Sequence, residues 1–377
     1  MGHKAEPAAT KSSQFRGLAD RFPPLDTMPM RSFLSRLFAT TLLAISCFGP
    51  GPLSAAESES AVVLMYHRVG ESKYPTTNTT VEQFEAHLAE IREGGYRVVP
   101  LRDLVTAIRD KKRIEDKTIA ITVDDAFLSV YREGWPRLKK AGIPFTLFIA
   151  TDAIDKRTGG YMSWDQIREL RDAGVTIGSQ TASHPHMPVL SRELLKEELE
   201  KSSRRFREEL GSTPDMIAYP YGEYSLAVGE VAREAGFIAG FGQHSGVVNP
   251  SSDFFYLPRF TFNETFGDVS RVRMAARALA IPTADVTPPD PFLGPGDVNP
   301  PAFGFTVKGP AVKRLPRLSC YASHEGKVNV ERLGERRIEV RMTRPFPAGR
   351  TRINCTMWAP GGRWHWFGRQ FYVGEKR

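Results

Sequence analysis

The feature that most constrains the fold is an apolar run rich in β-branched residues at 118–126, with the adjacent carboxylates Asp124 and Asp125 at its end. So little polar alternation is typical of a parallel strand that is covered on both faces. In folds made of such strands the ligand site lies beyond the carboxyl ends of the strands. Adjacent side chains point in different directions, so one acid could bind a metal while the other accepts a proton. The alternative is a polar strand end in which Asp125 caps the next helix.

Strand-like and helix-like segments alternate along the first two thirds of the chain. Strands are expected at residues 61–66, 98–99, 118–126, 144–150, 175–178, 216–219 and 237–241. Helices are expected at residues 81–93, 101–110, 128–141, 163–173, 191–210 and 227–235. This alternation has βαβ spacing, and it predicts a parallel α/β sheet that closes, or nearly closes, into a barrel over residues 57–280.

The last third of the chain has a different pattern. Residues 281–301 are rich in Pro and Gly and predict a linker. Residues 302–377 contain short β-type runs separated by turns, which predict a small antiparallel β-sandwich. Cys320 and Cys355 lie on separate runs and are expected to form a disulfide, two buried free thiols being the alternative. The aromatic residues of this part fit a sandwich core, or a surface that stacks on sugars: Trp358, Trp364, Trp366, Phe367, Phe371 and Tyr372.

The first 56 residues are predicted to be an N-terminal extension and a secretory signal. Arg31 and Arg36 precede a short apolar stretch at 37–48, and small residues near Ala56 follow it. The stretch is too short to span a bilayer, so cleavage near Ala56 is expected and no integral membrane segment would remain. A lipid anchor on Cys47 is the alternative. The protein is therefore expected to be periplasmic or secreted.

Net charge limits the kinds of partner. Residues 1–56 carry six Lys/Arg and three Asp/Glu, so removing them from totals of 51 and 43 leaves 45 minus 40, or about +5. This mild excess suits contact with an anionic envelope polymer and is also an ordinary solubility charge. The sequence has no basic cluster with interleaved aromatic residues, which is the pattern that would indicate binding to nucleic acid.

Polar residues follow several of the expected strands. His67 closes the first strand, the segment 179–186 follows another, and the segment 219–223 follows the next. Each is an ordinary loop when taken alone. A carboxylate pair, a His-containing loop and a Tyr-Pro-Tyr-Gly turn at successive strand ends indicate one site.

These residues resemble a known family. The sequences of 122–126, 179–185 and 219–222 resemble the first three motifs of the NodB-homology polysaccharide deacetylases, carbohydrate esterase family 4. His67 after Tyr66, and Arg259 after Leu-Pro, resemble the subgroup of poly-N-acetylglucosamine deacetylases. The resemblance covers roughly residues 60–265. It implies an irregular (β/α) barrel and metal-dependent removal of N- or O-acetyl groups from polysaccharides.

The resemblance also implies roles for individual residues. Asp124 would be the general base, and the backbone N–H of Tyr221 would face the oxyanion. Asp125 and His184 would hold a divalent metal, zinc first, with cobalt or nickel as alternatives. Gln180 stands where the family has a metal-binding His, and its side-chain oxygen could be a third ligand.

The chain departs from the family pattern in two further places. Ala218 replaces the Arg that usually opens the Tyr-Pro-Tyr-Gly motif, and Arg259 could supply the cation that orients Asp124. The late Leu-x-x-His motif that carries the acid is absent from the sequence, and His67 or His244 could replace it. For His67 a bond to backbone is the structural alternative.

The remaining expected site residues are contacts for the substrate, an acetylated polysaccharide. They are Tyr219, Pro220, Arg259 and His186, of which His186 could also substitute for Gln180 at the metal. The departures leave two functions open. One is a metal-dependent deacetylase, and the other is a non-catalytic carbohydrate-binding protein on a decayed deacetylase barrel. The retained acid pair favours the enzyme.

Overall fold

A computed structural model describes residues 60–157 and 159–374. The predicted extension and signal at residues 1–56 lie outside the described residues. None of the helices in the described part is both long enough and apolar enough to cross a membrane.

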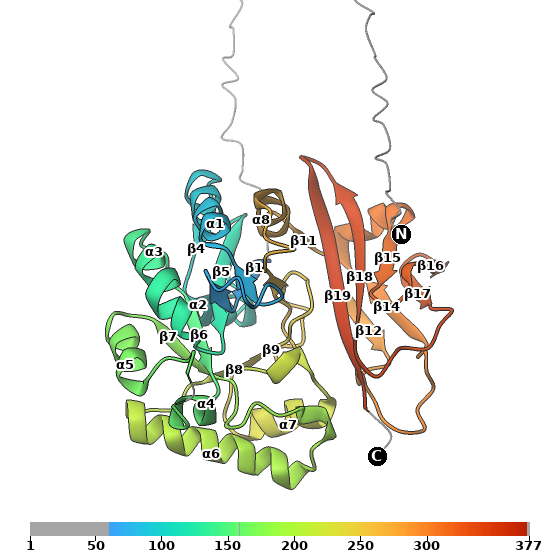
Figure 1. The fold of residues 1–377 in the computed structure, drawn as a ribbon. Helices are drawn as coiled ribbons and strands as arrows, with labels where there is room; N and C mark the ends of the chain where they lie inside the picture. Colours follow the sequence, from blue (N-terminus) through green and yellow to red (C-terminus); the bar gives the residue numbers. More distant parts are fainter. Residues whose placement is uncertain (1–59, 158, 375–377) are drawn as a thin grey trace, which may run out of the picture. The chain divides into compact units, whose positions relative to one another are not determined.

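The first sheet is parallel throughout and forms the predicted irregular barrel (Figure 1). Its spatial order is β10 (Phe260–Thr261), β1 (Val62–Tyr66), β5 (Thr118–Asp124), β6 (Thr146–Ile149), β7 (Thr176–Ser179), β8 (Met216–Ala218) and β9 (Ala239–Phe241), and β4 (Arg97–Val98) pairs with β5. A single parallel bridge between Phe241 and Leu257 closes the circuit, because the segment after Leu257 continues into β10 beside β1. The predicted (β/α) barrel is confirmed.

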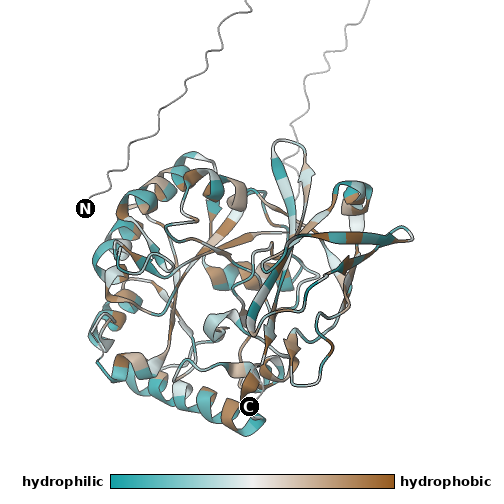
Figure 2. Cartoon of the chain, turned by 45° about the vertical axis from the view of Figure 1, so that its right-hand side comes forward, coloured by the Kyte–Doolittle hydropathy of each residue, from teal (hydrophilic) through white to brown (hydrophobic). Residues whose placement is uncertain are grey.

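Helices lie along the outside of this sheet (Figure 1). They are α1 (Val81–Glu93), α2 (Leu101–Arg109), α3 (Trp135–Lys140), α4 (Thr151–Asp155), α5 (Trp164–Asp172), α6 (Arg192–Leu210), α7 (Leu226–Glu234) and α8 (Val269–Ala276). Side chains of Thr80, Ser163 and Ser191 cap α1, α5 and α6 by accepting backbone N–H bonds. The predicted helix at 128–141 begins as a π-turn, Val130–Gly134, before α3. Most of α6 is hydrophilic, as expected for a helix with one buried stripe (Figure 2).

Strand β5 is buried along its whole length, so both of its faces are covered as the sequence predicts. Alternate side chains enter different core clusters. Ile119, Ile121 and Val123 pack with the helices on one side, while Ala120 packs with Phe148 and other residues on the opposite side. This burial holds the carboxyl end of β5, and the acids there, in a fixed position.

The second sheet is mostly antiparallel, with the order β11 (Leu279–Ala280), β19 (Arg363–Val373), β18 (Gly349–Ala359), β15 (Ser319–Ala322), β16 (Gly326–Leu333), β17 (Arg337–Arg341), β14 (Phe303–Val307) and β12 (Thr283–Thr287). Strand β16 pairs with β15 through its first half and with β17 through its second half. The sheet therefore folds over at β16, and Phe303 of β14 packs against Phe371 of β19 in a shared core. The predicted disulfide is present between Cys320 and Cys355, which face each other on β15 and β18.

Two features of the last third differ from the sequence pattern. Residues 281–301, predicted as a linker, include β12 and the short strand β13 (Phe292–Leu293), which pair with β14 and β19. The domain boundaries remain a prediction. Among the aromatic residues, Phe371 is in the core, but Trp358 and Trp364 are 42% and 39% exposed. These two lie on the outer face of the sheet because strand positions alternate.

Candidate active site

Four strand ends meet at one mouth of the barrel and carry the expected site residues. Asp124 ends β5 and Asp125 follows it, and His67 follows β1. His184 lies in the loop after β7 and Tyr221 lies in the turn after β8. Five non-glycine residues at these strand ends have φ between 53° and 73°: Asp125, Ala126, Thr181, His184 and Tyr221. Left-handed backbone is unfavourable for such residues and is found where a fold holds functional side chains in place.

Asp124 is held by a buried ion pair. Arg259 Nη1 donates to Asp124 Oδ1 at 2.7 Å and Nη2 donates to Oδ2 at 2.8 Å, and both side chains are 0% exposed. The Nε atom of Arg259 donates to the Gly242 carbonyl at 2.9 Å, which fixes the plane of the guanidinium. A bidentate pair of this kind orients a carboxylate strongly. Arg259 therefore has no surface for a substrate, and its contacts fit the orienting cation that replaces the Arg missing at Ala218.

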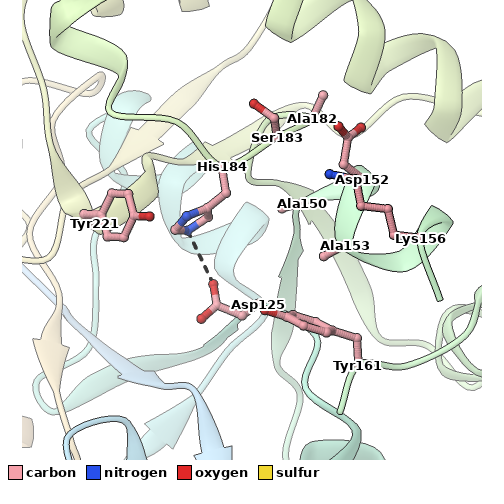
Figure 3. A pocket seen from close by; sticks show the side chains of 10 residues that line it. All are labelled: Asp125, Ala150, Asp152, Ala153, Lys156, Tyr161, Ala182, Ser183, His184 and Tyr221. Carbon is pink, nitrogen blue, oxygen red and sulfur yellow. Dashed lines mark ion pairs between the residues drawn. The ribbon is translucent and has the colours of Figure 1, made fainter. Parts of the chain in front are cut away.

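Asp125 and His184 face each other in the pocket drawn in Figure 3. Asp125 Oδ1 lies 3.6 Å from His184 Nε2. Burial lowers the pKa of His184, and the nearby Asp125 carboxylate opposes the shift. The imidazole is thus favoured in its neutral form, which is the form that binds metals. A pocket of about 410 Å³ opens beside these two residues, and Tyr161 and Tyr221 are also in its wall.

Gln180 is buried near Asp125, and its side-chain oxygen already accepts a hydrogen bond. Its Oε1 accepts a hydrogen bond from the backbone N–H of Asp125 at 3.2 Å. Its Nε2 is buried without a partner among the described residues. An amide nitrogen is not a metal ligand, so Gln180 contributes mainly by fixing the backbone of Asp125.

The aromatic turn after β8 contacts both histidines of the β7 loop. The Tyr221 ring meets the His184 ring edge-on at 4.5 Å and stacks on the His186 ring at 4.5 Å. His186 Nδ1 lies 2.7 Å from Oε2 of the buried Glu223, whose pKa is raised by burial. His186 is therefore held by Glu223 and Tyr221 rather than by the acids at the end of β5, and its side chain is half exposed.

Tyr219 and Pro220 are buried, although a substrate contact is expected for both from the sequence. Tyr219 is 0% exposed and belongs to the core cluster that includes Leu195 and Val228. Its hydroxyl lies so near Gly240 that a Cβ there would approach to 2.2 Å. These side chains shape the turn that presents Tyr221, and they have no surface to offer a ligand.

His67, which follows β1, lies near Asp124. Its Nε2 is 3.9 Å from Asp124 Oδ2, and its Nδ1 is buried without a partner within the described part of the chain. The other candidate acid, His244, packs against Tyr256 with ring centroids 4.4 Å apart. Burial, followed by the charge of Arg369, lowers the pKa of His244 to about 3. A histidine of that pKa is neutral at pH 7, so His244 is not suited to donate a proton there. His67 is the candidate whose ring nitrogen lies near Asp124.

Three supporting residues were not foreseen from the sequence. Glu198 of α6 accepts hydrogen bonds from the backbone N–H groups of Ala182 and Ser183, at 3.2 and 2.9 Å, and so clamps the β7 loop. Gln370 of β19 donates to the carbonyls of Gly222 and Tyr221, at 2.8 and 3.2 Å.

The third of these residues, Arg350 of β18, donates to the Tyr221 carbonyl at 3.4 Å. Gln370 and Arg350 are 149 and 129 residues from Tyr221 in sequence, so no local motif links them to it. The alternation of side chains along β18 and β19 predicts only that these two residues lie on the face opposite the sandwich core.

The donors at the mouth fit a metal site with two protein ligands. Two ligands of one tetrahedral zinc lie about 3.4 Å apart, given Zn–N and Zn–O distances near 2.1 Å. The separation of 3.6 Å between Asp125 Oδ1 and His184 Nε2 agrees with that spacing. No group of three or more His, Cys, Asp or Glu side chains suited to a metal occurs among residues 60–157 and 159–374. Further coordination positions would fall to water and substrate.

Comparisons with known proteins relate the barrel to polysaccharide deacetylases. The family model described as polysaccharide deacetylase matches residues 111–240, a stretch that contains Asp124, Asp125, His184 and Tyr221. A Staphylococcus aureus protein named poly-beta-1,6-N-acetyl-D-glucosamine N-deacetylase is 24% identical over 234 residues, which cover 55% of this chain and 80% of that protein.

Solved structures show the same fold. IcaB from Ammonifex degensii is 28% identical with a TM-score of 0.53, and the match covers 58% of this chain and 98% of IcaB. The Streptococcus pyogenes deacetylase PplD is 19% identical with a TM-score of 0.54, and the match again covers 58% and 98% of the two chains. Both matches leave more than a third of this chain without a counterpart.

Proposed function

Since this chain carries a polysaccharide deacetylase domain, we propose that the protein is a metal-dependent hydrolase that removes acetyl groups from an extracytoplasmic polysaccharide. The observation that supports this most directly is the meeting of two acids and two histidines at one mouth of the barrel. Asp125 lies 3.6 Å from His184, and Asp124 lies 3.9 Å from His67. A protein that only binds glycans has no need of this set.

The proposed metal would be held by Asp125 and His184. When bound, a zinc-like ion supplies a Lewis acid that polarises the acetyl carbonyl and lowers the pKa of water near it. Gln180 holds the Asp125 backbone through a 3.2 Å hydrogen bond, and Glu198 holds the loop that presents His184. Such supporting bonds commonly change metal affinity by about 10–100-fold.

The residues of the chain would then carry the proton transfers. Asp124, oriented by Arg259, accepts one proton from the attacking water, whose oxygen forms a bond to the acetyl carbon. The backbone N–H of Tyr221 donates to the carbonyl oxygen as negative charge develops there. His67 gives a proton to the leaving nitrogen as the carbon–nitrogen bond breaks, so acetate and a free amine are the products.

Acetate release from fully acetylated poly-β-1,6-N-acetyl-D-glucosamine, the polymer in the name of the Staphylococcus aureus relative, is the first test. We expect activity that is lost on chelation and restored by added zinc, cobalt or nickel. Asp124→Asn should lower kcat by about 10²–10⁴-fold, the usual contribution of a general base. The control is Asp165→Asn, because the Asp165 side chain is 88% exposed on α5.

The outcome also separates the enzyme from the glycan-binding alternative. Glycan binding by the wild type, with no acetate from any acetylated polymer and any added metal, would favour the alternative and refute the hydrolase. Equal release by wild type and Asp124→Asn would refute the role of Asp124.

We also propose that the mature chain is periplasmic or secreted. The Cys320–Cys355 disulfide supports this location, because such bonds persist in oxidising compartments. Cell fractionation with N-terminal sequencing of the mature protein is the measurement. Recovery of an uncleaved chain from the cytoplasm would contradict it.

A further inference from the structure

A groove of about 1,070 Å³ runs beside the catalytic mouth. One wall is the outer face of β15, β18 and β19, and the other is formed by barrel segments that include His67, Gln243 and Asn263. Pockets of roughly 300–1,000 Å³ hold drug-sized ligands, so this groove has room for an oligosaccharide. The proposed mechanism uses only His67 of these residues.

The groove carries exposed aromatic rings on the sheet side. Trp358 and Trp364 face each other in register across β18 and β19 and are 42% and 39% exposed. Tyr321 of β15 is 46% exposed on the same wall. Flat aromatic faces at the surface of a rigid sheet are suited to the apolar faces of sugar rings.

The same groove is strongly basic. Four arginines line it, and none of its lining residues in the described part of the chain is Asp or Glu: Arg271, Arg317, Arg350 and Arg352. Burial lowers the pKa of Arg271 and of Arg352, and the Nε atom of each is buried without a hydrogen-bond partner among the described residues. Arg317 lies over the Trp358 ring at 5.5 Å. Arg350 Nε lies 3.9 Å from Glu223 Oε1, whereas Arg271, Arg317 and Arg352 form no ion pair with a carboxylate among the described residues. Guanidinium groups without a carboxylate partner are suited to bind anions.

Two residues of the groove lining contact residues of the candidate active site. His67 lines the groove, and its Nε2 is 3.9 Å from Asp124 Oδ2. Arg350 also lines the groove, and it donates to the carbonyl of Tyr221, which stands in the wall of the catalytic pocket. A chain lying along the sheet could therefore present one of its acetyl groups to the two acids.

We propose that this groove binds an acidic acetylated polysaccharide, with its sugar rings on Trp358 and Trp364 and its carboxylates on the arginines. The proposal rests on the proposed function, and it names the substrate class of that site. It differs from the neutral polymer in the name of the Staphylococcus aureus relative. A deacetylated amino sugar carries a positive charge, so the same arginines disfavour the cationic product.

The test uses calorimetry to measure how tightly three oligosaccharides of equal length bind to the full-length protein. They are an alternating glucuronate–N-acetylglucosamine chain, an N-acetylglucosamine chain and a glucosamine chain. We expect the acidic chain to bind most tightly and the cationic chain most weakly. Raising ionic strength from about 0.01 to 0.15 M should narrow the difference, because the Debye length falls from about 30 to 8 Å. Equal affinity for the acidic and neutral chains at low salt would overturn the proposal.

Variants separate the charges from the rings. Arg317→Gln/Arg352→Gln should weaken binding of the acidic chain by about 10–100-fold and that of the neutral chain much less, as expected for lost hydrogen bonds to charged groups. Trp358→Ala should weaken binding of both chains. Arg336→Gln is the control, because Arg336 is exposed on the β16–β17 turn, away from the groove lining. An unchanged affinity in the double arginine variant would overturn the proposal.

Turnover of a short acetylated disaccharide distinguishes a failure of the proposed hydrolase from a failure of the proposed groove. Acetate release from it together with no preference for the acidic chain refutes the groove alone. Preferential binding of the acidic chain without release from any substrate refutes the hydrolase and leaves the groove supported.

Discussion

Replacing Arg259 by Met should destabilise the barrel strongly. The Arg259 guanidinium and the Asp124 carboxylate form two bonds of 2.7 and 2.8 Å, and both side chains are 0% exposed. Removing one partner of a buried pair leaves the other charge unpaired, at a cost of about 3–5 kcal/mol in the free energy of unfolding. No discount for solvent screening applies to groups without exposure. At about 2–4 °C per kcal/mol for a domain of 150–250 residues, the Tm should fall by about 6–20 °C.

Thermal unfolding at pH 7 of the wild type, Arg259→Met and Asp124→Asn/Arg259→Met measures this effect. The double variant also removes the carboxylate charge, so we expect it to recover most of the lost stability. Arg273→Met is the matched control, because Arg273 pairs with Glu90 while its side chain is 53% exposed. That change should cost less than about 1 kcal/mol. A loss in Arg259→Met no larger than in the control, or no recovery in the double variant, would refute the coupling.

Three further predictions follow from other features. Cys320→Ser/Cys355→Ser should lower the free energy of unfolding by about 4 kcal/mol, because the bond spans 35 residues; chemical unfolding measures this, and a change below about 1 kcal/mol contradicts it. Burial lowers the pKa of His244 from 6.5 to about 3. Between these two pH values the unfolded chain binds a proton that the folded chain does not, so the free energy of unfolding falls as the pH drops. From pH 7 to about pH 5 the wild type should lose about 2 kcal/mol more than His244→Phe in urea unfolding, at 1.4 kcal/mol per pH unit below 6.5, and equal losses would contradict this. Glu198→Ala should weaken metal binding by about 10–100-fold in calorimetry, while Glu200→Ala, exposed on the same helix, should not; equal affinities in both variants would be the contrary result.

Local patterns explain why much of the fold could be predicted. The continuous apolar run of β5 identified a strand with both faces covered, and the helices predicted at 163–173 and 191–210 begin at the serines that cap α5 and α6. Composition was a weaker guide in the Pro- and Gly-rich segment, where β12 finds its partner β14 about twenty residues later. Pairing of an edge strand depends on the partner, and the segment alone carries little signal of it.

The convergence of the candidate site residues could be predicted where they follow the ends of parallel strands. Asp124 and Asp125 end one strand, and their meeting with His184 follows from parallel strands sharing one edge. Burial inside a motif was harder to foresee, because adjacent residues of the same turn diverge, with Tyr219 in the core and Tyr221 at the pocket. The hydrogen bond that Gln180 accepts from the Asp125 backbone N–H also could not be predicted from the sequence pattern.

The hydrogen bonds from Gln370 to the carbonyls of Tyr221 and Gly222 tie the last strand of the chain to the bend that faces the acids. Cutting the chain after residue 301 would thus remove a support of the candidate active site together with most of the second sheet. A protein reduced to the barrel needs a different donor for those two oxygens. Removing the final strand should therefore loosen the turn that carries the Tyr221 amide, the group that we propose faces the developing negative charge.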